Sequence, residues 1–361
     1  MEYIPIAKPE ITEADRKLVD IVLESGWVSS AGAYISFFEK EFAQYCGRKY
    51  AVAVANGTVA LHLALLSLDL LIHDEIFVPN LTFIATANVV KYLSNTPNLI
   101  DINPETWNVS LNEIKRKIRA NTKVIIPVHL FGLPCDMEAL MDITKNLDIH
   151  IVEDCAEAHG ATINGRKVGS FGDISCFSFF GNKIITTGEG GMCLTDDEKL
   201  YEKMLVLRDH GMSRTRKYWH EVVGYNYRMT NMQAALGCSQ LNRIDQYLIA
   251  RRKNGQIYRE FLKESPYITL PVDDVGHAYW VFPILVDGER DKIIERFEQK
   301  KIETRPFFYP LTSLPPYLNH GFCPVSEEIS ARGIMLPCYP SLKPEQIEYI
   351  CETLLDYWKD E

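Results

Sequence analysis

The chain has 361 residues, of which 47% are hydrophobic and 24% charged, and its formal net charge is −10. This composition is typical of a globular enzyme with one large and one smaller domain. The acidic balance and the lack of a basic block argue against nucleic acid or an anionic membrane as a partner. No segment reaches the roughly 18 to 20 apolar residues of a membrane span.

The N-terminal residues 1–5 carry no basic region followed by an apolar stretch, so we expect no signal peptide. The nine cysteines are scattered and form no CxxC pair, which argues against a zinc site. We therefore predict no metal. The cysteines are interpreted as buried, reduced thiols of a cytoplasmic protein.

Short apolar segments alternate with helical patterns between residues 45 and 200. The expected strands are 50–55, 75–79, 98–101, 122–128, 149–153, 174–180 and 191–195, and the expected helices are 59–70, 82–93, 111–118 and 137–146. Strands that are apolar throughout and separated by helices predict a parallel sheet covered on both faces. Ligands of such sheets bind at the carboxyl ends of the strands.

The pattern changes in the last third of the chain. Residues 199–210 and 230–265 look helical, and they precede expected strands at 277–286 and 302–308 and expected helices at 326–332 and 344–358. We interpret this as a small α/β C-terminal domain. The predicted domains are residues 1–250 and 251–361, with the boundary placed only within about 245–268.

Lys183 follows an apolar strand and precedes a glycine-rich turn at residues 188–191. Such a position suits an amine that must lose its proton and attack a carbonyl. Asp154 ends a neighbouring apolar strand. Pyridoxal 5'-phosphate (PLP) needs such a pair, because its aldehyde takes an amine and its ring nitrogen an anion. Taken singly, a lysine near glycines is more often a surface residue, and an aspartate after a strand is more often a helix cap.

Further residues suit the same cofactor. Gly57 and Thr58 stand at an expected helix start, where free N–H groups bind phosphate. The same residues are also typical of a plain helix N-cap that binds no ligand. Ser178 is placed to bind that phosphate or, alternatively, the backbone. Phe83 either stacks on the ring or packs in the core, and His129, at a strand end, is a candidate to face the pocket.

Four sequence segments resemble, together with the segment around Lys183, the DegT-like family of PLP-dependent sugar aminotransferases of fold type I. They are SGWVSS at 25–30, NGTVAL at 56–61, EDCAEAHG at 153–160 and GYNYRMT at 224–230. The resemblance covers essentially the whole chain. It implies an aspartate-aminotransferase-like α/β fold, with a large domain built on a mixed, mostly parallel sheet covered by helices and a small C-terminal domain.

The resemblance also implies roles for single residues. Lys183 is the catalytic lysine that binds the cofactor, and Asp154 holds the ring nitrogen. The other implied cofactor contacts are Gly57, Thr58 and Ser178 at the phosphate, Phe83 at the ring and Glu157 near the ring hydroxyl. Asn226 reaches the phosphate of a neighbouring subunit, which implies a homodimer with shared active sites.

The implied reaction moves an amino group from L-glutamate to PLP, giving pyridoxamine phosphate, and then to C4 of a nucleotide-linked 4-keto-6-deoxyhexose. The segments around residues 218–220 and 303–310 resemble the branch that uses GDP-4-keto-6-deoxymannose, and a dTDP- or UDP-linked 4-keto-6-deoxyglucose is the alternative. The candidate substrate contacts are Ser29, His129, Trp219, Arg305 and Tyr309. A PLP-binding regulator without chemistry and an amino-acid aminotransferase remain open.

Overall fold

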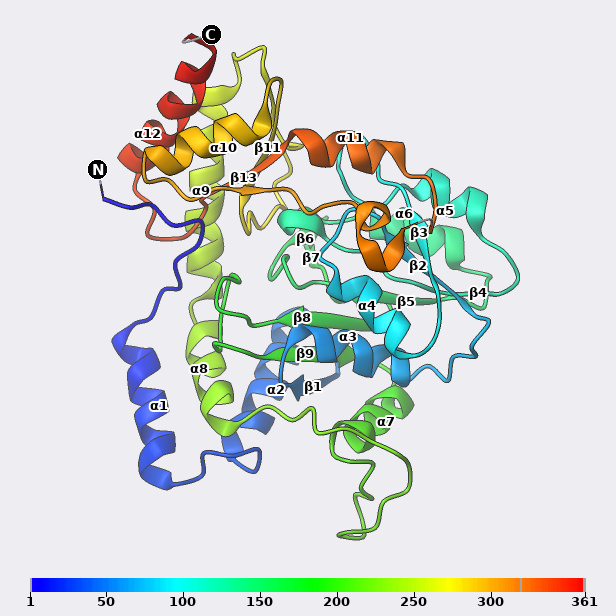
Figure 1. The fold of residues 1–361 in the computed structure, drawn as a ribbon. Helices are drawn as coiled ribbons and strands as arrows, with labels where there is room; N and C mark the ends of the chain where they lie inside the picture. The colour runs from blue at the N-terminus through cyan, green and yellow to red at the C-terminus, as the bar shows by residue number, and fades with distance from the viewer. Residues whose placement is uncertain (1, 319, 360–361) are drawn as a thin grey trace.

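A computed structural model gives the fold of residues 2–318 and 320–359 (Figure 1). Its centre is a seven-stranded sheet of order β1-β9-β8-β5-β4-β2-β3. Its strands are β1 (Tyr50–Val54), β2 (Glu75–Pro79), β3 (Pro97–Ile100), β4 (Thr122–Ile125), β5 (His150–Asp154), β8 (Ile174–Ser178) and β9 (Gly191–Thr195). Only β9 runs antiparallel to its neighbours β1 and β8. The expected mixed, mostly parallel sheet is therefore confirmed.

Both faces of this sheet are buried, which explains why its strands are apolar throughout. Ala51 and Ala53 of β1 contribute to one core cluster with Phe42 and Phe177, whereas Val52 and Val54 contribute to another on the opposite face. The helices of this part of the chain are α1 (Glu13–Ser25), α2 (Ala33–Cys46), α3 (Gly57–Leu66), α4 (Ala85–Tyr92), α5 (Leu111–Lys117), α6 (Met137–Thr144), α7 (Glu198–Arg208) and α8 (Asn231–Leu241). The sequence analysis assigned no element to α1 or α2.

The helix α9 (Ile244–Leu262) leads from the large sheet to a second, four-stranded antiparallel sheet of order β10-β11-β13-β12 (Figure 1). Its strands are β10 (Ile268–Thr269), β11 (Phe282–Val286), β12 (Arg305–Pro306) and β13 (Gly333–Leu336). The helices α10 (Arg290–Gln299), α11 (Pro324–Arg332) and α12 (Pro344–Leu355) complete this part. The predicted boundary between residues 250 and 251 falls inside α9.

Several predicted elements are shorter or broken in the structure, and the strand expected at 302–308 is reduced to β12 (Arg305–Pro306). The long helical stretch is divided at Asn242–Arg243 into α8 and α9. The strand expected at 277–286 begins only at Phe282, because the carbonyl oxygens of Tyr279 and Trp280 accept hydrogen bonds from the buried Arg251 guanidinium instead of a neighbouring strand. Tyr279 also has a φ of 48°, which is incompatible with a regular strand.

Short elements also occur in the connections. A two-stranded sheet pairs β6 (Thr162–Ile163) with β7 (Arg166–Lys167), and single 3₁₀ turns lie at η1 (Leu130–Gly132), η2 (Leu311–Ser313), η3 (Pro315–Tyr317) and η4 (Asp356–Lys359). Among the described residues, no helix combines the length and apolar character needed to cross a bilayer. All nine cysteines are buried and free, as expected.

Candidate active site

A cavity of about 640 Å³ lies at the carboxyl ends of β5 and β8. Residues from distant parts of the sequence line it: Gly57 at the start of α3, Asp154 at the end of β5, Lys183 after β8, and Trp280 and Arg305 from the C-terminal part. This is the edge of the sheet where the sequence analysis placed Asp154, Ser178 and Lys183. The cavity therefore brings the predicted catalytic lysine together with predicted cofactor contacts.

The start of α3 packs closely against the end of β8. The Asn56 side chain caps α3 by accepting a hydrogen bond from the Val59 N–H at 3.0 Å. A Cβ atom on Gly57 would lie 2.6 Å from the Ser178 Cβ and 3.1 Å from its Oγ. Only glycine permits this approach, which brings the helix N-terminus, the Thr58 side chain and the Ser178 hydroxyl to the same end of the cavity.

Asp154 is buried and held by two hydrogen bonds. Its Oδ2 accepts from the Thr86 hydroxyl at 2.8 Å, and its Oδ1 accepts from the Ala156 N–H at 3.1 Å. Burial raises the pKa of Asp154, and the two hydrogen bonds and the charge of Lys183 oppose this shift. Its position suits a carboxylate that is to face a cationic ring nitrogen.

Lys183 lies between an aromatic face and a carboxylate. Its Nζ is 3.8 Å from the centroid of the Trp280 ring and 3.7 Å from Oε1 of Glu157. Burial lowers the pKa of Lys183, whereas the nearby charges of Glu157 and Asp154 raise it. A lysine whose pKa is lowered by burial holds more of the neutral amine that attacks a carbonyl.

Glu157 is held from the other side by a strained turn. Its Oε2 accepts a hydrogen bond from the Phe131 N–H at 2.8 Å, and Phe131 has a φ of 57°, which is rare for a residue with a side chain. Burial raises the pKa of Glu157 to about 7, against the opposing charge of Lys183. Near neutral pH this carboxyl group can therefore either hold or accept a proton beside the lysine amine.

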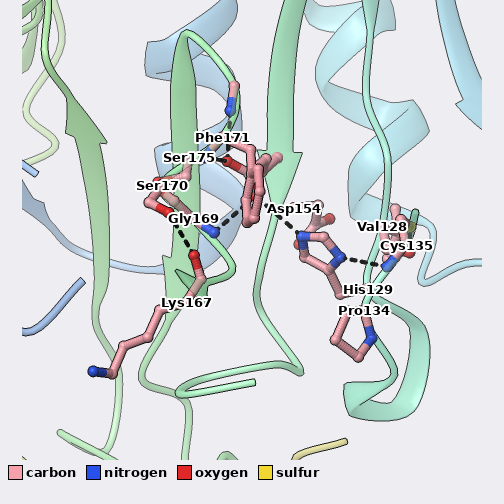
Figure 2. Close-up of polar contacts among 12 residues, drawn as sticks. Val128, His129, Pro134, Cys135, Asp154, Lys167, Gly169, Ser170, Phe171 and Ser175 are labelled. Carbon is pink, nitrogen blue, oxygen red and sulfur yellow. Dashed lines mark hydrogen bonds and ion pairs between the residues drawn. The ribbon is translucent and has the colours of Figure 1, made fainter. Parts of the chain in front are cut away.

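His129 does not line the cavity. Its Nε2 lies 3.3 Å from Oε2 of the buried Glu153, and its Nδ1 accepts from the Cys135 N–H at 3.0 Å, a contact that Figure 2 shows. The Glu153 carboxylate also accepts the N–H groups of Gly169, Phe171 and Gly172 at 2.7 to 2.8 Å. Both side chains are thus engaged in fixing the end of β5.

The same arrangement bears on metal binding. His129, Glu153 and Cys155 form a buried group whose possible ligand atoms lie within 4.8 Å of one another. Four N–H donors already surround the Glu153 carboxylate, so its oxygens are occupied without an ion. The prediction that the protein uses no metal is therefore kept.

The remaining predicted site residues fall into two groups. Phe83 and Arg305 line the cavity, and Phe83 is 55% exposed there. The others lie on the surface and do not line the cavity of their own chain: Ser29, Trp219, Asn226 and Tyr309.

Several lining residues were not among the site residues expected from the sequence, and Thr86, Tyr92 and Trp280 are examples. Trp280 stands in an apolar segment that resembles a strand, so nothing distinguished it from a core residue. In the structure its Nε1 donates to the Asn182 carbonyl at 2.8 Å, which fixes the ring beside Lys183. Thr86 stands three residues after Phe83 in the sequence, and the hydroxyls of Thr82 and Thr86 beside Phe83 were the available signal.

Comparison with known proteins agrees with this geometry. Residues 9–355 match the DegT/DnrJ/EryC1/StrS aminotransferase family. The chain belongs to this family. It is 45% identical to GDP-perosamine synthase of Escherichia coli O157:H7, with 100% of both chains covered, and 41% identical to that of Vibrio cholerae, with 98% of this chain and 99% of the relative covered.

Solved structures of the aminotransferase family share the whole fold. Helicobacter pylori PseC, an aminotransferase of pseudaminic acid biosynthesis, matches with a TM-score of 0.95 at 27% identity over 100% of both chains. A putative sugar aminotransferase from Streptococcus pneumoniae in its PLP form matches with a TM-score of 0.94 at 29% identity over 99% of both chains. The expected fold and the expected aminotransferase class are confirmed.

The residues of the cavity fit PLP, as the sequence analysis predicted. The close packing at Gly57 brings the N-terminus of α3 and the hydroxyls of Thr58 and Ser178 together, where they can bind the phosphate. Asp154 offers a buried anion for the ring nitrogen. Lys183 offers the amine for the aldehyde. When bound, PLP supplies the electron-withdrawing ring that makes a substrate C–H bond acidic.

We predict that Gly57→Ala destabilises the protein by roughly 1–3 kcal/mol and weakens cofactor binding, because the new Cβ forces α3 away from β8. Urea unfolding and titration with PLP measure the two effects. Gly181→Ala is the matched control, since the nearest atom to a Cβ there is the Gly188 oxygen at 4.0 Å. Equal stability of the two variants would contradict the proposed close packing.

We also predict a pH-dependent effect of Glu157→Gln on stability. The pKa of Glu157 is raised from 4.5 to about 7, so between these pH values the folded protein keeps a proton that the unfolded chain has lost, and stability falls as pH rises. Glutamine does not titrate. The stability of Glu157→Gln relative to wild type should therefore increase from pH 4.5 to 7, by up to about 3 kcal/mol. Urea unfolding of the cofactor-free proteins measures this, and a difference that is constant with pH would contradict it.

Proposed function

We propose that this protein is a PLP-dependent aminotransferase that moves the amino group of L-glutamate to C4 of GDP-4-keto-6-deoxymannose. The product is the corresponding GDP-linked 4-amino-4,6-dideoxy sugar, GDP-perosamine. The observation that carries the proposal is the buried Lys183 amine between Trp280 and Glu157, at the centre of a cavity with a phosphate end and a carboxylate end. The full-length similarity to two GDP-perosamine synthases supports the choice of GDP and of this hexose.

In this proposal each residue has a defined task. The Lys183 Nζ takes a proton from the α-carbon of glutamate and later delivers one to C4 of the sugar. Glu157 balances the charge of that amine at 3.7 Å and keeps it directed into the cavity. Asp154 faces the ring nitrogen, and the Thr86 hydroxyl holds it in place at 2.8 Å.

We further propose that two copies of the chain form a homodimer with shared sites. Asn226 is exposed and does not line the cavity of its own chain, yet it lies in the segment that resembles the family's intersubunit contact. Exposed apolar side chains also occur before this segment and between α1 and α2, and a partner chain could cover them: Trp27, Val28, Tyr218, Trp219, Val222 and Val223. Ser29 and Trp219 would then contact the substrate of the neighbouring site.

Cytoplasmic location forms part of the proposal. The nine free, buried cysteines suit a reducing compartment, where disulfides do not form.

The visible spectrum of the purified protein tests the reaction. We expect L-glutamate to remove the band of the bound cofactor and GDP-4-keto-6-deoxymannose to restore it, because the two ligands carry the amino group in turn. If only a dTDP- or UDP-linked 4-keto-6-deoxyglucose restores the band, the aminotransferase reaction stands, but that sugar nucleotide and not the GDP-linked one is the substrate. A band that glutamate does not change would contradict an aminotransferase and favour a regulator that only binds PLP.

Lys183→Ala should bind PLP but lose at least about 10³-fold in amino-sugar formation, since it lacks the amine that moves the proton. Product formation followed by chromatography measures the loss. Lys167→Ala is the matched control, because Lys167 lies over the Tyr45 ring and away from the cavity. Turnover by Lys183→Ala close to that of the control would refute the assigned role.

Mixing two inactive variants tests the shared sites. Lys183→Ala and Asn226→Ala should each be strongly impaired, yet mixed dimers contain one site in which both residues are intact. An equal, fully exchanged mixture should regain about one quarter of the wild-type activity, because half of the dimers are mixed and half of their sites work. Differently tagged subunits verify the exchange, and mixed dimers without activity would show that Asn226 serves its own chain.

A further inference from the structure

Arg305 is the only arginine that the described residues bring to the wall of the cavity. The other cation there is Lys183, which the proposed reaction uses for chemistry. The acidic residues of the wall are Asp154, Glu157 and Glu189. An anionic ligand that enters this cavity therefore meets a single arginine among the described residues of the same chain.

Arg305 is held to one side by a carboxylate that is itself fixed. Its Nη2 lies 3.0 Å from Oε1 of Glu303. The other oxygen of Glu303 accepts from the Ile6 N–H at 3.0 Å and from the Tyr3 hydroxyl at 3.2 Å. The backbone of Glu303 is also tied to the N-terminal segment, because its N–H donates to the Ile4 carbonyl at 2.8 Å.

These contacts hold Glu303 in place, whereas Arg305 is the movable partner of the pair. The Arg305 side chain is 49% exposed and that of Glu303 29%. An ion pair this exposed contributes little energy, so another anion competes with it easily. A guanidinium also binds carboxylates and phosphates equally well, through paired N–H groups.

The proposed reaction brings two different anions to this one cavity in turn. L-Glutamate carries two carboxylates, and the sugar nucleotide carries a diphosphate. The two ligands occupy the cavity at different times, because each half of the reaction must finish before the other begins.

We propose that Arg305 is a shared anion anchor that exchanges between three partners: Glu303 between ligands, a carboxylate of the amino donor in the first half-reaction, and the diphosphate of the sugar nucleotide in the second. This inference rests on the proposed function. Glu303 acts as the intramolecular placeholder, and the N-terminal segment 3–6 fixes its position.

Binding measurements on the cofactor-loaded protein test the inference. The Kd of GDP is measured by calorimetry, and the Kd of L-glutamate from the extent to which it changes the cofactor band. We expect Arg305→Gln to weaken both by about tenfold, the contribution of one charge-assisted contact. We expect Glu303→Gln to strengthen both severalfold, because the competing carboxylate is gone while its hydrogen-bond acceptor for Ile6 remains.

Arg116→Gln is the matched control, since Arg116 pairs with Glu113 on α5, away from the cavity, and neither ligand should bind differently to it. Weakening of only one ligand by Arg305→Gln would overturn the shared role. Weaker binding in Glu303→Gln would overturn the placeholder and make Glu303 a support for Arg305. If glutamate leaves the wild-type band unchanged, the proposed function fails and the inference fails with it, which separates that case from the others.

Discussion

The burial of the Lys183 amine is the constraint on which the rest of the site depends. A buried ammonium is costly unless a neighbour compensates it, and a buried neutral amine is reactive. The structure supplies two neighbours at nearly equal distance, the Trp280 ring at 3.8 Å and the Glu157 carboxyl at 3.7 Å. Glu157 carries its own burial cost, with a pKa raised to about 7. Burial thus lowers the pKa of the lysine and raises that of the glutamate, which brings the two pKa values closer together.

The reversal of one strand explains how the lysine is fixed. Because β9 is antiparallel to β8, the connection between them stays at the carboxyl end of β8, and Lys183 lies within this connection. The backbone of this connection is closed by hydrogen bonds from Thr187 N–H to Phe179 O and from Phe179 N–H to Gly190 O. The Thr186 hydroxyl also donates to Phe179 O at 3.0 Å. A loop tied in this way holds the amine in place more firmly than a surface loop would.

The sequence predicted those parts of the fold and site that local patterns encode. Apolar strands gave the parallel sheet and placed Asp154 and Ser178 at its carboxyl edge, because that placement follows from strand direction alone. Trp280 could not be found in this way. Its approach to Lys183 depends on Arg251 of α9, whose guanidinium donates to the Tyr279 and Trp280 carbonyl oxygens. His129 was a candidate to face the pocket but does not line it. Its position at a strand end does not determine where its ring points, and in the structure the ring contacts Glu153.

The site divides its tasks between two environments. In the proposed function, Lys183, Asp154 and Glu157 handle protons and the cofactor. They lie in the interior, where main-chain hydrogen bonds fix the two carboxylates. Arg305 and the surface residues Trp219 and Tyr309 lie where solvent reaches them. Buried groups are bound by many neighbours and tolerate little change, whereas exposed ones are replaced at small cost in stability. In the proposed function, residues at the rim such as Trp219 and Tyr309 select the sugar nucleotide, so these contacts can vary while the buried centre keeps its chemistry.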